Sequence, residues 1–325
     1  MFVKLDEEIV GILCCPLCKA DMEVREQEFI CKDCATRYPR RGVKSGIYQE
    51  YIWDFRIHRP PFCVPSRLER WFNIQEKYEA RHREMSVRDR FKEYVDEIDS
   101  VSEIYKKEFD LNGRVLDVGG GQGRLRHFLN DKGVLLYISV DPYLDVFMDL
   151  GTRPNLLKAY PCLSQPCNFI GCHAEHLPFR SETFDWVHMR SVLDHFQDPY
   201  LSLKEAYRVL AADGTLLIGS TVYGGKSLLK KRDDVHDSSP SMVSRIKRKV
   251  QREGLDGLFR AMINRMSKNK KISADPIETD DHMFRWRYDD LVSLLSITGF
   301  DIAKEHWQKP PYDTCVYISA LKKLG

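Results

Sequence analysis

The sequence predicts an α/β protein in which a doubly wound parallel sheet follows a small metal-binding module. Residues 114–129 are typical of a strand, a glycine-rich turn and a helix, and residues 134–141 are typical of a buried strand that ends in an acid. Two Cys-x-x-Cys pairs lie within the first 34 residues, a pattern typical of a metal site. The length of 325 residues favours two domains, or one large domain with an appendage.

Composition excludes several classes of protein. The chain is 43% hydrophobic and carries a formal net charge of +2, so it is neither disordered nor a polyelectrolyte. The first eight residues hold acids where a signal peptide needs a basic flank, and no apolar run reaches the roughly 18 residues of a transmembrane segment. We therefore expect a cytoplasmic protein whose ten cysteines are reduced or bound to metal rather than paired in disulfides.

The cysteine pairs predict a zinc site. Cys15 and Cys18 form one pair and Cys31 and Cys34 the other, and four thiolates on two short turns suit a tetrahedral ion. Cys14 is a fifth thiol, and we favour Cys15 as the ligand because it leaves the two-residue gap. The twelve residues between the pairs predict a hairpin over residues 22–30, and a piece this polar needs the metal for its stability.

The segment from Cys15 to Ile47, with its Cys-Pro-Leu-Cys and Cys-Lys-Asp-Cys-Ala-Thr-Arg-Tyr-Pro runs, resembles the zinc-ribbon family that includes the tRNA-methyltransferase activator subunit. It also resembles the ribbon ahead of bacterial ribosomal RNA guanine methyltransferases. We accordingly expect a zinc ribbon over residues 1–50. Residues 51–65 hold aromatics and three prolines and predict a linker, and apolar residues at helical spacing over 66–109 predict helices that lead into the main domain.

The run Asp117-Val-Gly119-Gly120-Gly121-Gln-Gly123 lets the backbone pass close under a ligand. This run resembles motif I of the class I S-adenosylmethionine-dependent methyltransferases (methyltransferase type 11-like). Further motifs of that family follow in order, at residues 134–141, 174–179, 184–189, 191–195 and 205–218. The resemblance implies a seven-stranded Rossmann-like methyltransferase sheet within residues 66–325, with S-adenosylmethionine as methyl donor.

The resemblance also implies a set of donor-binding residues. Asp141 is placed to accept the ribose hydroxyls, and His173 stands where relatives usually have an aspartate that bonds the adenine amino group. A neutral imidazole can accept that hydrogen bond. The complete set is Asp117, Gly119, Gly120, Gly121, Gly123, Asp141, His173, Ala174, Glu175 and Arg190.

Methyl transfer from a sulfonium is an in-line displacement, so positioning supplies much of the rate and a base is needed only for a poorly ionised acceptor. His195 lies beyond the predicted fourth strand, where open α/β sheets place their chemistry, and is the favoured base. A purely structural role for this histidine stays open. Tyr223, His188 and His282 are weaker candidates.

Residues 226–271 are strongly basic, with 14 Lys or Arg and five Asp or Glu. They lie in an expected helical insertion at 225–275 whose apolar stripe predicts a lid over the substrate. The alternatives are a docking surface for an anionic substrate and peripheral contact with an acidic membrane.

The favoured function is methyl transfer to oxygen or nitrogen of a small-molecule, glycan or lipid-linked acidic substrate. The first alternative is ribosomal RNA base methylation, although Asp and Glu outnumber Lys and Arg within the ribbon. The second alternative is a non-catalytic binding or scaffold protein with a methyltransferase fold.

Overall fold

The computed structural model describes residues 2–45, 48–57, 65–129, 133–226, 282–309, 312 and 314–323. The expected basic insertion at 225–275 lies outside the described residues from position 227 onward, so its lid, docking and membrane roles stay predictions. Within the described part of the chain, no helix is both long and apolar enough to span a membrane.

The described residues form one mixed sheet of twelve strands, where the sequence predicted a sheet of seven. Strands β8, β7, β6, β9 and β10 lie side by side and parallel, and β12 and then β11 continue the sheet antiparallel. Their bounds are Gly113–Val118 for β6, Val134–Asp141 for β7, Cys167–Gly171 for β8, Phe184–Arg190 for β9, Leu210–Thr221 for β10, Phe300–Trp307 for β11 and Cys315–Lys322 for β12.

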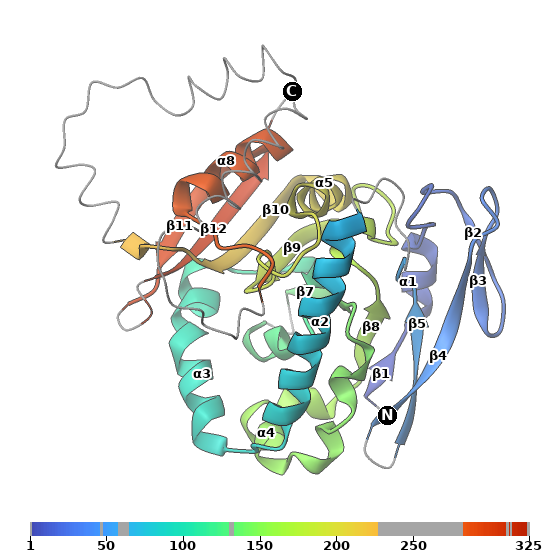
Figure 1. The fold of residues 1–325 in the computed structure, drawn as a ribbon, viewed down its shortest axis with the longest axis horizontal. Helices are drawn as coiled ribbons and strands as arrows, with labels where there is room; N and C mark the ends of the chain where they lie inside the picture. Colours follow the sequence, from blue (N-terminus) through green and yellow to red (C-terminus); the bar gives the residue numbers. More distant parts are fainter. Residues whose placement is uncertain are drawn as a thin grey trace.

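Helices cover both faces of this sheet (Figure 1). Successive residues of a strand point to opposite faces, and Val115 and Leu116 on β6 accordingly enter two different hydrophobic cores. One core includes residues of α5 (Pro199–Val209) and α8 (Tyr288–Thr298), and the other includes residues of α3 (Phe91–Glu103) and the π-helical turn η1 (Ile104–Glu108). This arrangement confirms the doubly wound α/β prediction.

The N-terminal strands extend the sheet beyond β8. They are β1 (Val3–Lys4), β2 (Met22–Val24), β3 (Glu28–Cys31), β4 (Arg37–Ser45) and β5 (Tyr48–Asp54), with helix α1 (Glu7–Ile12) after β1. The predicted hairpin is confirmed as the antiparallel pair β2 and β3. Strand β5 pairs with β8 through Trp53 opposite Ile170 and Asp54 opposite Gly171.

The expectation of an irregular linker at 51–65 was therefore wrong for residues 51–54, because the open edge of β8 supplies hydrogen-bond partners that the sequence pattern did not reveal. The domain boundaries themselves stay a prediction. Helix α2 (Pro65–Ser86) then crosses in front of the strands in Figure 1.

Short helices occupy the connections after β6, β7 and β8. The helix expected after the glycine turn is only a five-residue 3-10 helix, η2 (Arg124–Phe128), because Gly123 is left-handed before it and Leu129 is extended after it. The others are η3 (Leu144–Phe147), η4 (Leu150–Thr152), α4 (Pro154–Ala159), η5 (Pro161–Ser164) and η6 (Ala174–His176).

Candidate functional site

A cavity of about 710 Å³ lies where the strand order reverses. The neighbours of β6 are β7 on one side and β9 on the other, and open α/β sheets bind ligands at the carboxyl ends of strands at such a switch point. The lining includes residues 119–122 of the glycine turn, Asp141 after β7, Arg190 at the end of β9, and His195.

The glycine turn is shaped to carry a ligand. Gly119 and Gly121 have φ angles of +70° and +50°, a region that favours glycine. The Gly121 amide donates to Asp141 Oδ2 at 3.3 Å, and Ser139 Oγ donates to the Gly121 carbonyl at 2.9 Å. A Cβ on Gly121 would meet no atom within 4 Å. The backbone therefore borders open space that a side chain would otherwise fill, which fits a ligand passing close to it.

Asp117 supports the glycine turn and is itself held by hydrogen bonds from other side chains. Its buried carboxylate accepts from Tyr137 Oη at 2.5 Å and from His188 Nδ1 at 2.7 Å. Because Nδ1 then carries the proton, His188 Nε2 accepts from Tyr105 Oη at 2.8 Å. A Cβ on Gly120 would collide with the Asp117 carboxylate. These contacts account for His188 as a buried positioning residue.

Asp141 lies between this cavity and a smaller compartment of about 60 Å³. Its Oδ1 accepts from the Tyr143 amide at 2.8 Å, and burial raises the pKa of Asp141 to about 7. His173, Ala174 and Glu175 line the smaller compartment together with Asp141. The structure thus brings these residues of the predicted donor site together around the ends of β7 and β8.

His173 and Glu175 are each held by contacts to other segments. His173 Nδ1 accepts from the Ile57 amide at 3.4 Å, and its ring meets the Trp71 ring edge-on at 5.2 Å. Glu175 Oε1 accepts from the Asp198 amide at 3.0 Å, and burial raises the pKa of Glu175 to about 7.

His195 belongs to a group of three polar side chains at the cavity wall. His195 Nε2 lies 3.9 Å from Asp194 Oδ1, and His282 Nε2 lies 3.4 Å from Asp194 Oδ2. The two imidazole centroids are 4.6 Å apart. Asp194 Oδ1 is buried and has no hydrogen-bond partner among the residues that the structure describes. The arrangement suits an imidazole that gains a proton beside a carboxylate. Tyr223, by contrast, is 70% exposed and does not line the cavity.

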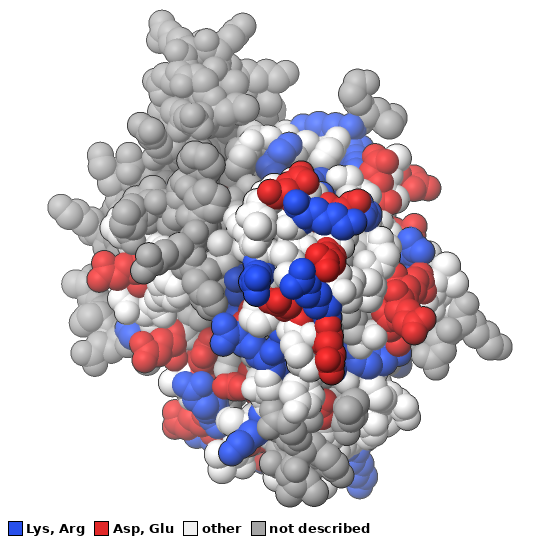
Figure 2. Space-filling view, turned by 90° about the vertical axis from the view of Figure 1, so that its right-hand side faces the viewer, with Lys and Arg blue, Asp and Glu red and all other residues white. Residues whose placement is uncertain are grey.

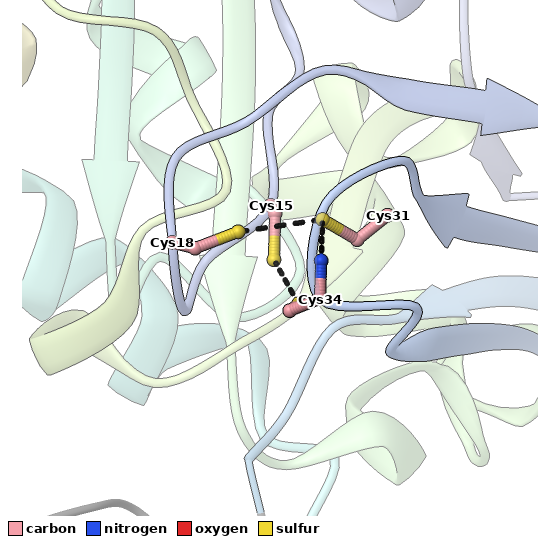
Figure 3. A group of neighbouring side chains, drawn as sticks. All are labelled: Cys15, Cys18, Cys31 and Cys34. Atoms are coloured by element: carbon pink, nitrogen blue, oxygen red, sulfur yellow. Dashed lines mark hydrogen bonds between the residues drawn. The ribbon is translucent and has the colours of Figure 1, made fainter.

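The four predicted metal ligands converge in the ribbon (Figure 3). The sulfur atoms of Cys15, Cys18, Cys31 and Cys34 all lie within 4.8 Å of one another, with 3.7 Å between Cys15 and Cys34 and 3.3 Å between Cys18 and Cys31. Zn–S bonds of about 2.3 Å in a tetrahedron place sulfurs roughly 3.8 Å apart, so the donor set fits zinc. Cys14 lies outside this group and is buried.

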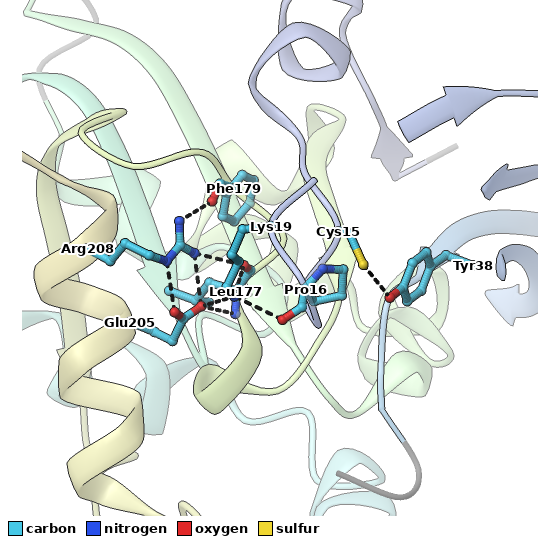
Figure 4. Close-up of polar contacts among 8 residues, drawn as sticks. All are labelled: Cys15, Pro16, Lys19, Tyr38, Leu177, Phe179, Glu205 and Arg208. Carbon is cyan, nitrogen blue, oxygen red and sulfur yellow. Dashed lines mark hydrogen bonds and ion pairs between the residues drawn. The ribbon is translucent and has the colours of Figure 1, made fainter. Parts of the chain in front are cut away.

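Contacts around the first cysteine pair fix the ribbon to the main domain (Figure 4). Lys19 Nζ lies 2.7 Å from Glu205 Oε2 and donates to the Pro16 carbonyl at 2.9 Å. Arg208 Nε and Nη2 also donate to Glu205, at 2.8 and 2.9 Å. Burial lowers the pKa of Lys19; for Glu205 burial acts upward, but Arg208 and Lys19 bring its pKa below the usual range.

Sequence reasoning missed one wall of the cavity. Tyr78 and His82 on α2, Tyr94 on α3, Arg124 on η2 and Arg153 before α4 all line it. These residues belong to no motif, and arginines spread over separate elements give no spacing signal. Only the packing of α2, α3 and α4 around the glycine turn assembles them.

Comparisons with known proteins point to one family for the centre of the chain. Residues 116–218 match the family described as "Methyltransferase domain", so the glycine turn, Asp141 and His195 all lie within the matched segment. This segment of the chain is therefore similar to methyltransferase domains.

Individual relatives are distant. Uncharacterized protein MJ1123 of Methanocaldococcus jannaschii is 30% identical over 142 residues, which cover 42% of this chain and 61% of that protein. The ubiquinone/menaquinone biosynthesis C-methyltransferase UbiE of Blochmanniella floridana is 28% identical over 183 residues, covering 54% and 66%. The chain thus spans less than two thirds of these curated relatives. The crystal structure of PH0226 from Pyrococcus horikoshii OT3 aligns with a TM-score of 0.46 and 18% identity, covering 71% and 92%.

Proposed function

We propose that the chain transfers a methyl group from S-adenosylmethionine to an acidic small-molecule, glycan or lipid-linked acceptor. The observation that carries this proposal is the turn of Gly119 and Gly121, with open space beside Gly121 and the Asp141 carboxylate next to its amide. A close backbone approach and an acid after the second parallel strand are what a nucleoside-bearing donor requires at this place in the sheet.

Each predicted donor residue has a role in this proposal. Asp141 accepts the ribose hydroxyls, and Gly119, Gly120 and Gly121 line the cavity, with open space for the donor beside Gly121. Gly123 does not line the cavity and ends the turn with a φ of +81°. His173 and Ala174 border the compartment of about 60 Å³ that would take the adenine ring. Asp117 and Glu175 hold the walls in place, through Tyr137 and the Asp198 amide respectively. Arg190 lines the larger cavity near the expected methyl group.

The donor supplies an electrophilic methyl group, and the chain supplies position and a proton acceptor. His195 receives the acceptor's proton at its imidazole, and Asp194 stabilises the resulting imidazolium from 3.9 Å. Asp194 also holds His282 nearby, since its carbonyl accepts from the Met283 and Phe284 amides at 2.8 and 3.1 Å. A base of this kind is needed only for a poorly ionised acceptor.

Oxygen and nitrogen remain the proposed acceptor atoms. The UbiE relatives are named C-methyltransferases of ubiquinone/menaquinone biosynthesis. The tests should therefore also include acceptors that are methylated at an activated carbon. The zinc ribbon is proposed as a structural module, because all four positions around the ion would be taken by thiolates and none stays open for substrate.

Figure 2 views the molecule from the side that carries the ribbon. Lys and Arg side chains alternate there with Asp and Glu, and the coloured atoms form no continuous basic surface on this face of the described residues. RNA binding depends on such a surface. This face therefore gives no support for RNA binding, and we retain the small-molecule acceptor as the proposal.

Methyl-labelled S-adenosylmethionine tests the function directly. The purified protein is incubated with the labelled donor and, separately, with a small-molecule extract, a lipid extract and ribosomal RNA. We expect label in the small-molecule or lipid fraction, and we expect His195→Gln to reduce its rate of appearance by tenfold to a hundredfold. Label in RNA alone would establish the RNA alternative, and donor binding without transfer to any fraction would favour the scaffold alternative.

A further inference from the structure

One wall of the 710 Å³ cavity holds arginines that the proposed methyl transfer does not use. Arg88 follows α2, Arg124 begins η2, and Arg153 immediately precedes α4. Figure 1 shows α2, α3 and α4 grouped around the same lower part of the molecule. Arginine is the side chain best suited to bind carboxylate and phosphate oxygens in a fixed geometry.

Arg124 and Arg153 are fixed against one aromatic ring. Their guanidinium carbons lie 6.0 and 5.7 Å from the centroid of Tyr94. Arg153 Nη2 donates to Tyr94 Oη at 2.6 Å, and Arg124 also lies 5.4 Å from the Tyr160 centroid. Two positive charges are thus held on a common support before any ligand arrives, which lowers the entropy cost of binding.

These charges are not balanced within the described residues. Arg124 lies 3.1 Å from Glu97, but that carboxylate is also 3.7 Å from Arg190. Arg153 is only 6% exposed, and no described carboxylate lies within 4.0 Å of its guanidinium. The Arg153 Nε is buried and has no hydrogen-bond partner within the described part of the chain. An unpaired buried charge and a donor without a partner both cost stability. An anion bound at this wall would reduce both costs.

The imidazole of His82 lies close enough to these arginines for their charges to affect its pKa. His82 on α2 lines the cavity. Burial and then the charges of Arg124 and Arg153 lower its pKa to about 4. His82 therefore stays neutral at physiological pH and presents a further hydrogen-bonding side chain without adding charge.

We propose that Arg124 and Arg153, with Arg88 at the rim, form a subsite for a carboxylate or phosphate group of the methyl acceptor. The assignment to the acceptor rests on the proposed function. The donor is assigned to Asp141 and to the smaller compartment that His173 lines. Ligand cavities span about 300–1,000 Å³, and 710 Å³ leaves room for an acceptor beside the donor. Anion recognition is thereby placed inside the cavity rather than in the basic segment 226–271.

Inorganic phosphate is the probe for the test. We expect calorimetric titration of the full chain to give one phosphate site, and we expect Arg124→Gln and Arg153→Gln each to weaken it at least tenfold. Lys158→Gln is the matched control, because Lys158 is an exposed cation on α4, the helix that Arg153 precedes, and does not line the cavity. Phosphate affinity should be unchanged in this control. No phosphate binding by the wild type, or equal weakening in the control, would overturn the proposal.

S-Adenosylhomocysteine separates the two anions that could occupy the subsite. If the subsite serves the acceptor, phosphate binds equally well when S-adenosylhomocysteine is present, and Arg124→Gln keeps its S-adenosylhomocysteine affinity within about twofold of wild type. That retained affinity also shows that the variant is folded. Competition between the two ligands would assign the arginines to the donor's carboxylate and overturn the acceptor assignment. Phosphate binding without any S-adenosylhomocysteine binding would instead contradict the proposed function.

Discussion

The cysteine turns and the glycine turn both send the chain through left-handed backbone conformations, but they do so with different residues. Lys19 and Ala35 follow the two cysteine pairs with φ angles of +64° and +56°. Gly119 and Gly121 form the turn at the cavity. A residue with a Cβ loses roughly 1–2 kcal/mol in this conformation, whereas glycine adopts it readily.

This difference shows where each turn finds its stability. The glycine turn is held by hydrogen bonds to neighbouring protein residues, among them Asp141 and Ser139. The cysteine turns need a stronger constraint, which the proposed zinc and the Lys19–Glu205 contact would supply. Loss of metal should therefore disturb the ribbon far more than the cavity, and the following predictions test that contrast.

The largest effect is expected from Cys31→Ser. Removing one thiolate should eliminate about one zinc per chain and unfold the ribbon, since structural zinc contributes roughly 10–16 kcal/mol in small zinc modules. Metal analysis and amide exchange over residues 2–45 measure both consequences. Cys315→Ser is the control, because Cys315 lies outside the cluster. Wild-type protein without zinc, or a ribbon equally protected in both variants, would contradict the structural-metal account.

A smaller loss is expected when the ribbon's attachment is weakened. Glu205→Gln leaves Lys19 and Arg208 without their shared carboxylate. The free energy of unfolding should fall by about 3–5 kcal/mol, because Glu205 is largely buried. Glu23→Gln removes only an exposed pair with Arg25 and should leave the free energy of unfolding nearly unchanged, because solvent screens such a pair. Similar losses in both variants, measured by denaturant titration, would show that the buried pair has no special role.

The glycine turn is tested by comparing Gly121 with Gly11, a glycine elsewhere that also has open space around the Cβ position. Gly121→Ala should reduce S-adenosylhomocysteine affinity about a hundredfold, because the added methyl occupies the ligand's space and the residue has φ of +50°. Gly11→Ala also meets no atom within 4 Å but lies on α1, away from the cavity. The Gly11→Ala variant should bind S-adenosylhomocysteine with wild-type affinity. Full binding by the Gly121 variant would place the ligand elsewhere.

The smallest effect is a pH dependence. Burial raises the pKa of Asp141 to about 7, and ribose hydroxyls favour the ionised carboxylate, so donor binding must lower this pKa. Affinity for S-adenosylhomocysteine should therefore rise as pH increases from 6 to 8, by up to tenfold per unit well below the pKa. Asp141→Asn should flatten this dependence. Glu175 has a similarly raised pKa, so an unchanged slope in Asp141→Asn would assign the titration to that residue.

The sequence predicted those parts of the molecule whose chemistry is local. Cys15 to Cys34 converge because each pair closes its own turn, and the strand, the turn and Asp141 follow from hydrophobic pattern and glycine spacing. The pairing of β5 with β8 was not predictable, since any open strand edge offers similar partners. Likewise, Arg124 and Arg153 meet at Tyr94 only after three separate elements have packed.

The central claim is that the cavity beside the glycine turn binds the methyl donor, and direct titration tests it. Wild-type protein is titrated calorimetrically with S-adenosylhomocysteine, and Asp141→Ala is titrated in parallel. We predict one site per chain, weakened by roughly 1–3 kcal/mol in the variant because the ribose hydroxyls lose their acceptor. Absence of binding to the wild type, or equal affinity in the two proteins, would contradict the account.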